Sequence, residues 1–286
     1  MFETSAALGG FREVMNSAHR QPDPYWAADW FGYALQRATT QAEHAEALQM
    51  MGVSWRNDGR LEGALECGAR AVMIAQQSNE LGLLARAQCD LAITWHLRAL
   101  FLHNTFDRDS ELSEGDKQAP HAFRQAKALL RRSITNFQWV IRVSEPGDQR
   151  RALKADLAVA RGALGLLTHD LGYRTSRITK WGYSSRQNFR KRKYLRFHGI
   201  QLLERSYSVL SGLDNQAHTL NTLLRLMQCL PATERLAHLG EALKLADSLG
   251  RPHGDVFGAL RGRRSVIRGQ LRLIKSRMQP REEEEA

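Results

Sequence analysis

The chain has 286 residues, of which 43% are hydrophobic and 25% charged, and its formal net charge is +11. The length suits one or two domains or a single elongated repeat protein, and the composition excludes wholesale disorder. Seven prolines and an aromatic content of 8% exclude collagen-like and turn-rich all-β chains. No apolar run reaches the roughly 18 residues of a membrane span. The start, Met1-Phe2-Glu3, has no basic region typical of a signal peptide, so we expect a cytoplasmic protein without membrane association.

Almost every segment has apolar residues at helical spacing and is bounded by Pro or Gly, and no segment alternates as a strand would. The spacing predicts eleven helices, at 6–20, 25–37, 42–56, 61–77, 80–103, 120–143, 149–171, 188–211, 216–229, 233–248 and 254–278. Their short connections favour antiparallel hairpins. The fold class is therefore all-α, either a helical bundle or a solenoid of helix pairs.

An internal repeat favours the solenoid. When the chain is shifted by 40 residues, Gly52 coincides with Ala92 and Trp55 with Trp95. A small residue lets a second helix approach closely, and a large residue three positions later fills the space between the paired helices. Three further pairs coincide at the same shift: Ala45 with Ala85, Ala47 with Ala87, and Met51 with Leu91.

The first of these repeats resembles the tetratricopeptide repeat family. Its pattern of a large residue, a Leu-Gly pair, an aromatic residue, a turn glycine and two spaced alanines is matched by Leu48, Met51-Gly52, Trp55, Gly59, Ala64 and Ala71. Leu164-Gly165 with Gly172, and the stretch 236–250, look like parts of later repeats. The resemblance implies a solenoid of antiparallel helix pairs over 41–250, with a helical cap over 1–40. An unrelated helical bundle is the alternative.

The resemblance also implies a concave groove, lined by the first helix of each pair, that binds a peptide or a partner helix. The family's Lys/Asn clamp for a C-terminal carboxylate is not matched, since Gln49 and Val53 stand at those positions. A helix or an internal extended peptide is therefore the expected ligand. The groove positions are Glu46, Gln49, Met50, Val53, Arg56 and Asn57 in the first repeat, and Arg86, Cys89, Asp90, Ile93 and His96 in the second.

The charge is distributed unevenly along the chain. Residues 1–120 carry 10 basic and 16 acidic side chains, whereas residues 121–286 carry 31 and 14. Two predicted insertions contribute, an acidic one at 104–118 and a basic, aromatic one at 173–187. The stretches 171–203 and 256–281 contain no acid. The predicted basic face consists of Arg174, Arg177, Lys180, Arg186, Arg190, Lys191, Arg192, Lys193, Arg196, Arg261, Arg264, Arg268 and Arg272.

The C-terminal segment 251–286 is predicted as a long basic helix followed by an acidic tail. Its apolar stripe would cap the end of the solenoid, with a basic stripe at the solvent edge. The apolar stripe consists of Leu260, Ile267, Leu271, Ile274 and Met278.

Several ligands fit the basic face. Arginine binds phosphates and carboxylates through two parallel hydrogen bonds, so an acidic protein would dock there. Cations interleaved with aromatic residues also suit single-stranded nucleic acid. The aromatic residues of the first stretch are Tyr173, Trp181, Tyr183, Phe189, Tyr194 and Phe197. A solvated face without a specific role is the third interpretation.

No catalytic, nucleotide-binding or metal-binding motif was found, and Cys67, Cys89 and Cys229 are predicted to be buried reduced thiols. His169 and Asp170 are adjacent, so on a helix their side chains should point about 100° apart and form no dyad. We therefore expect a non-enzymatic scaffold without cofactor or metal that recognises a protein or peptide partner. A nucleic-acid-associated protein is the alternative.

Overall fold

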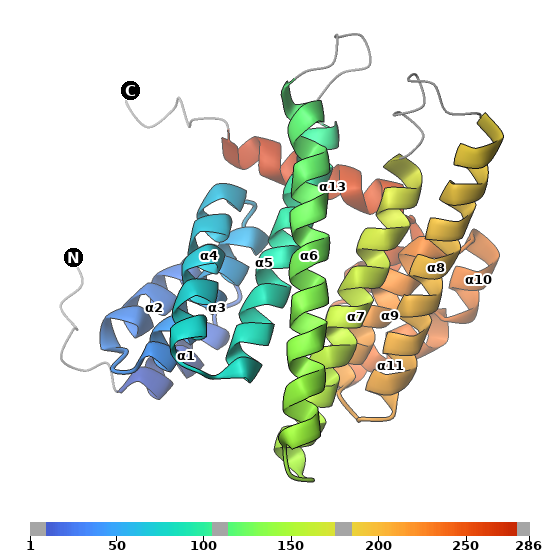
Figure 1. Ribbon diagram of the computed structural model, residues 1–286. Coiled ribbons are helices and arrows are strands. Elements are labelled where there is room, and N and C mark those ends of the chain that lie inside the picture. Colours follow the sequence, from blue (N-terminus) through green and yellow to red (C-terminus); the bar gives the residue numbers. More distant parts are fainter. Residues whose placement is uncertain (1–9, 105–113, 175–184, 279–286) are drawn as a thin grey trace, which may run out of the picture. The chain divides into compact units, whose positions relative to one another are not determined.

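The computed structural model describes residues 10–104, 114–174 and 185–278, and all regular elements in these ranges are α-helices (Figure 1). The predicted all-α class is confirmed for this part of the chain. The helices are α1 (Phe11–His19), α2 (Pro24–Arg37), α3 (Gln41–Asn57), α4 (Leu61–Gln77), α5 (Leu81–Asn104), α6 (Glu114–Val143), α7 (Asp148–Arg174), α8 (Ser185–Ser211), α9 (Gln216–Cys229), α10 (Ala232–Ala237), α11 (Leu239–Ser248), α12 (Gly254–Leu260) and α13 (Arg263–Met278).

Local chemistry explains where several helices begin. Thr40 and Glu43 form a reciprocal capping box at α3, with Thr40 Oγ1 accepting from the Glu43 amide and the Glu43 carboxylate accepting from the Thr40 amide. At α2, Asp23 caps the amide of Tyr25 and Pro24 occupies the first helical turn. The side chain of Asn215 caps α9. These caps satisfy backbone donors that the first turn of a helix leaves unpaired.

Two predicted helices are divided. The predicted helix 233–248 is interrupted at His238, which separates α10 from α11. The predicted helix 254–278 is interrupted at Gly262, whose φ of +79° lies in the left-handed region that an α-helix cannot continue through. The basic C-terminal helix α13 is therefore shorter than predicted.

The predicted insertions are also shorter than expected. Helix α6 begins at Glu114, although Pro120 was predicted to be its first residue. Helix α7 extends to Arg174, and α8 begins at Ser185. Of the segments 104–118 and 173–187, residues 105–113 and 175–184 lie outside the described residues, as do residues 1–9 and the acidic tail.

The chain forms two compact units. Unit 1 comprises residues 1–136 and 270–286, and unit 2 comprises residues 137–269. In unit 1, α1 and α2 pack through Phe11, Val14 and Phe31 against Ala47 of α3, and α3, α4 and α5 pack in sequence. In unit 2, α7 and α8 pack along their length (Figure 1), and α9, α11 and α12 share a core that includes Leu223 and Val256.

The crossing of α3 and α4 is as close as the repeat predicts. A Cβ atom on Gly52 would lie 3.2 Å from the carbonyl oxygen of Ala64 and 3.4 Å from Cβ of Cys67. The ring of Trp55 covers Gly63, where an added Cβ would overlap it. Gly52 therefore allows α3 and α4 to approach closely, and the ring of Trp55 fills the space beside the crossing, as the sequence predicts.

A second internal repeat, of 73 residues, relates the hairpin α5–α6 to the hairpin α7–α8. Buried Ser133 on α6 donates to the carbonyl of Ala85 on α5 at 2.7 Å, and buried Ser206 on α8 donates to the carbonyl of Ala158 on α7 at 2.5 Å. Each serine lies 48 residues after its acceptor, and the second contact lies 73 positions after the first. Buried histidines and leucines recur at the same interval: His96 with His169, and Leu130 with Leu203.

The C-terminal half of α13 belongs to unit 1 and packs on the turn between α3 and α4. A Cβ on Gly59 would lie 3.5 Å from the Cα of Ile274, and Arg277 forms an ion pair with buried Asp58 at 3.2 Å. The apolar stripe was predicted to cap the end of the solenoid. In unit 1, Leu271 and Ile274 of this stripe are buried, and Ile274 lies beside the first predicted repeat pair. In the part of the chain that the structure describes, no helix is both long and apolar enough to cross a membrane.

Candidate anion-binding site

The structure brings together three of the predicted groove residues. Helix α3 contacts α5, and Gln49 Nε2 donates to Asp90 Oδ2 at 2.7 Å. Arg56 Nη1 donates to the Asp90 carbonyl at 3.0 Å and lies 3.4 Å from its carboxylate. These polar groups therefore satisfy one another, which leaves less hydrogen-bonding capacity for a ligand.

The other groove positions are divided between core and surface. Cys89 and His96 are buried, so a partner on this surface would not reach them, which corrects their assignment to the groove. Glu46 is bound by Arg12 of α1 at 2.9 Å. The remaining positions are either half-buried, as are Met50, Val53 and Ile93, or exposed, as are Asn57 and Arg86.

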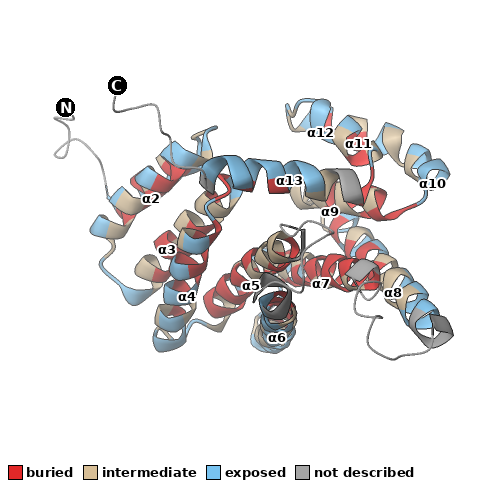
Figure 2. Ribbon diagram, turned by 90° about the horizontal axis from the view of Figure 1, so that it is seen from above, coloured by how far each residue is buried: buried red, intermediate tan, exposed pale blue. Residues whose placement is uncertain are grey.

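The described part of the basic face is mostly exposed. On α8, Arg190, Lys191 and Lys193 are exposed, whereas Arg192 and Arg196 are half-buried. Figure 2 shows α8 with exposed and intermediate stretches next to its grey start. Arg261, Arg268 and Arg272 are also exposed, the first two in unit 2 and the third in unit 1. Arg177 and Lys180 lie outside the described residues, as do the side chains of Arg174, Arg186 and Arg264.

The aromatic side chains of α8 are exposed next to these cations. Phe189, Tyr194 and Phe197 have exposed fractions of 62%, 63% and 58%. Tyr194 stacks on His198 with ring centroids 5.7 Å apart, whereas Phe189 and Phe197 have no ring partner among the described residues. Large apolar rings in water are unfavourable, so their clustering on one short stretch marks a candidate binding surface.

A cavity of about 640 Å³ lies beside α8 within unit 2. It lies among the end of α7, one face of α8, the end of α9, α10 and the junction of α12 with α13. The residues that line it are His169, Phe189, Lys193, Arg196, Phe197, Ile200, Gln228, Cys229, Leu230, Pro231, Arg235, Arg261, Gly262 and Arg263.

The charge around the cavity is positive. The side chains of Lys193 and Arg261 form no hydrogen bond or ion pair with any described residue. The side chain of Arg235 donates to the carbonyls of Leu230 and Leu260, at 2.8 and 2.7 Å, and pairs with no carboxylate among the described residues. None of the described residues that line the cavity is acidic. The arrangement therefore favours an anion.

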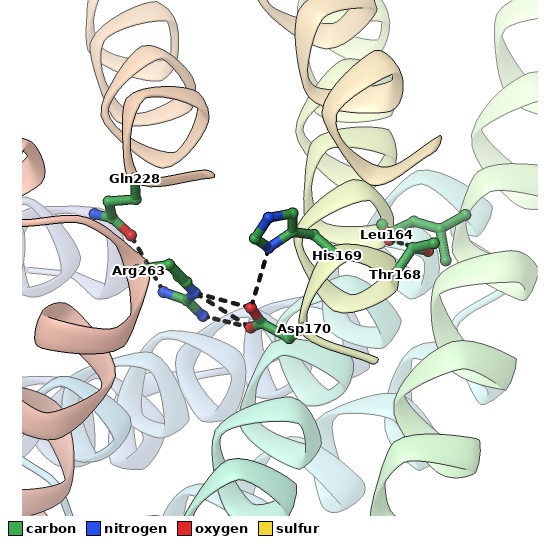
Figure 3. A network of polar contacts seen from close by, with 6 residues as sticks. All are labelled: Leu164, Thr168, His169, Asp170, Gln228 and Arg263. Carbon is green, nitrogen blue, oxygen red and sulfur yellow. Dashed lines mark hydrogen bonds and ion pairs between the residues drawn. The ribbon is translucent and has the colours of Figure 1, made fainter. Parts of the chain in front are cut away.

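Arg263, which lines the cavity, belongs to a buried ion pair with Asp170 that the sequence alone does not indicate (Figure 3). Arg263 Nη2 donates to Asp170 Oδ2 at 2.8 Å, and Arg263 Nη1 donates to Gln228 Oε1 at 3.2 Å. The side chains of Arg263 and Asp170 are only 5% and 1% exposed. The pair joins the first turn of α13 to α7 and α9. Because its partners are 93 residues apart, only tertiary packing reveals it.

His169 lies closer to Asp170 than predicted. Its Nδ1 is 3.5 Å from Asp170 Oδ1, so the expectation that the two side chains point apart is wrong (Figure 3). The carboxylate is nevertheless held by Arg263, which donates to it through both Nε and Nη2. Asp170 therefore serves the ion pair with Arg263.

The three cysteines are buried and form no disulfide, as predicted. Burial is the main cause that raises the pKa of the Cys229 thiol far above its usual value, and the nearby Asp170 carboxylate raises it further. Arg263 and Arg235 lower this pKa only in part, so Cys229 is a neutral thiol at pH 7. Within the described ranges, no three His, Cys, Asp or Glu side chains are grouped so that they could hold a metal ion.

A second cavity in unit 2, of about 510 Å³, offers a comparison. It lies between α7 and α8, and its lining includes the cations Lys154, Arg161 and Arg205. No aromatic side chain is among its described lining residues. Both cavities are therefore lined by cations. Of the two, only the cavity beside α8 also has exposed aromatic rings among its described lining residues.

Comparison with known proteins gave no match, either to a protein-family model or to a curated protein. The resemblance to tetratricopeptide repeats therefore stays a prediction based on the residues themselves.

Proposed function

We propose that the chain is a non-enzymatic binding scaffold, built from tetratricopeptide-like helix pairs, that docks an anionic partner on α8 and acts as a subunit of a larger complex. One observation carries this proposal. The cavity beside α8 combines the cations Lys193, Arg235 and Arg261, which pair with no carboxylate of the described chain, with the exposed rings Phe189 and Phe197.

The physical basis is electrostatic attraction together with burial of exposed rings. Cations in a partly enclosed space raise the local concentration of an anionic partner and speed its association. Covering the two phenyl rings removes apolar surface from water, which adds affinity. An acidic protein and a nucleic acid both meet the requirement for charge.

The surface formed by α3 and α5 is a second candidate, for a protein or peptide partner. Its predicted groove positions include the half-buried apolar residues Met50, Val53 and Ile93 and the exposed polar residues Asn57 and Arg86. It is the weaker candidate, because the central polar groups of Gln49, Arg56 and Asp90 already bind one another.

Retention on immobilised heparin, a general polyanion, tests the proposal. The triple variant Arg190→Ser, Lys191→Ser, Lys193→Ser should elute at clearly lower salt than the unmodified chain, because three exposed cations of the docking surface are gone. Arg192 is kept, because it is half-buried and makes contacts of its own. Circular dichroism should be unchanged.

A matched control separates a local surface from overall charge. The variant Arg124→Ser, Arg131→Ser, Arg132→Ser removes the same charge from exposed positions of α6. It should elute close to the unmodified chain. Equal losses for the two variants would mean that heparin senses only net charge, and the docking role of α8 would then be abandoned.

A further inference from the structure

We propose that the cavity beside α8 binds single-stranded nucleic acid, with a base against Phe189 or Phe197 and the adjoining phosphodiester against Lys193 and Arg261. This inference rests on the proposed function, because it names the anionic partner that would dock on α8. It adds that the partner is recognised through its bases as well as its charge.

The spacing along α8 supports this ligand. Phe189, Lys193 and Phe197 follow one another at four-residue intervals on the face that lines the cavity. With a rise of 1.5 Å per residue, the backbone positions of the two phenylalanines are about 12 Å apart along the helix, and Lys193 is midway between them. Single-stranded nucleic acid likewise alternates flat bases with phosphates, and proteins bind it by combining stacking with cations.

The accessibility of the rings and the size of the cavity agree with this. Phe189 and Phe197 expose 62% and 58% of their surface, so a base can reach either ring without rearrangement of the helix. The cavity of about 640 Å³ is within the range of pockets that enclose most of a small ligand. Every base has a flat π-face, so stacking would give binding with little sequence preference.

The cations extend beyond what one small ligand requires. Lys193 and Arg261 line the cavity without a partner among the described residues, and Arg190 and Lys191 continue the charge along α8 outside it. A free nucleotide would leave these outer cations unused. An acidic peptide would neutralise the cations, but its carboxylates would not stack on the rings.

Fluorescence anisotropy on the full chain tests the inference with two labelled probes. One is an oligothymidylate of about 12 nucleotides, and the other is an abasic strand of the same length and charge. The strand with bases should bind at least about tenfold more tightly, because the abasic strand cannot stack. Binding of both should weaken as NaCl rises from about 50 to about 200 mM.

Two paired variants assign the contacts. Phe189→Leu with Phe197→Leu should lower affinity for the thymidylate strand about tenfold and leave the abasic strand unaffected. Lys193→Gln with Arg261→Gln should weaken both strands and reduce the slope of log affinity against log salt by about 2. Circular dichroism should show unchanged helicity, since all four side chains are exposed.

Matched controls use equivalent side chains elsewhere. Trp139→Leu removes a ring of α6 that is 53% exposed and does not line the cavity, and it should leave both affinities unchanged. Lys154→Gln with Arg205→Gln removes two cations from the second cavity, where no described lining residue is aromatic. This pair should weaken binding less than Lys193→Gln with Arg261→Gln does.

The possible failures are distinguishable. Equal affinity for both strands would overturn recognition of bases and leave only the docking of an anion. A mononucleotide that binds as tightly as the strand would overturn the single-strand assignment. Binding of polyglutamate without binding of either strand would overturn the inference and leave the proposed function intact. Failure to bind any of these polyanions, heparin included, would remove both.

Discussion

At the scale of single residues, Gly52 tests the close crossing of α3 and α4. Gly52→Leu should lower the free energy of unfolding by about 1–3 kcal/mol, because the new side chain has no space against Ala64 and Cys67. Chemical denaturation measures this. Gly240→Leu is the matched control, since Gly240 lies on α11 with nothing within 4 Å of an added Cβ. Similar stability of the two variants would remove the packing argument at Gly52.

Arg263 tests the buried ion pair. Arg263→Met should lower the free energy of unfolding by about 3–5 kcal/mol, because it leaves the carboxylate of Asp170 buried without its charge partner. The double variant Arg263→Met, Asp170→Leu should recover much of this loss, since no unpaired charge remains. Arg151→Met is the control, because the Arg151 and Asp148 side chains of its ion pair are 76% and 102% exposed and should contribute little to stability. A double variant as unstable as the single one would contradict the assignment.

At the scale of helices, most of the chain could be predicted because apolar residues recur at the helical period and Pro or Gly separates the segments. The breaks at His238 and Gly262 could not be predicted from this spacing. The residues around them are compatible with a helix, and tertiary packing decides where the chain turns. Arg235, for example, reaches across to the carbonyl of Leu260 beside the second break.

The candidate site was predictable only in part. Composition identified the basic, aromatic segment of α8, including Phe189 and Phe197, because cations and rings there are adjacent in sequence. The opposite walls of the cavity come from α9, α10 and the junction of α12 with α13. Arg235 and Arg261 line the cavity because of contacts between helices that are distant in sequence, and the spacing of apolar residues does not predict such contacts.

Tyr207 links α8 to α11 and makes that contact dependent on pH. Its hydroxyl donates to Glu241, and burial, together with this carboxylate, raises the pKa of Tyr207 to about 12. The folded state therefore favours the neutral phenol relative to an unfolded tyrosine, whose pKa is about 10. The resulting stabilisation is fully present below pH 10 and is lost as pH rises through about 12.

An ultraviolet titration of phenolate formation checks this. Six tyrosines are present, and Tyr207→Phe should remove a step near pH 12. The same substitution should flatten the loss of stability between pH 10 and 12. Complete ionisation of every tyrosine in the folded protein by about pH 11 would contradict the raised pKa.

At the scale of the whole molecule, the 73-residue repeat is shared by two helical hairpins, whereas the positive charge is concentrated in one of them. The 73-residue repeat gives the hairpins α5–α6 and α7–α8 equivalent serine contacts, yet their charged surroundings differ. Buried Phe123 on α6 corresponds to half-buried Arg196 on α8 at this interval. A common scaffold thus accommodates an apolar contact in one hairpin and part of a basic cavity in the other.

The excess charge should also limit stability at low salt. Residues 121–286 carry 31 basic and 14 acidic side chains, a net charge of +17, so their repulsion opposes the compact state. Raising NaCl from about 10 to about 150 mM shortens the Debye length from about 30 to about 8 Å. The Tm should then rise by about 2–4 °C, which corresponds to about 1 kcal/mol.

The variant Arg190→Ser, Lys191→Ser, Lys193→Ser should have a higher Tm at low salt, and its Tm should change less as salt is added. A Tm that falls with added NaCl would mean that attractive ion pairs outweigh this repulsion. The basic surface would then be neutralised by acidic side chains of the same chain and would not be accessible to a partner.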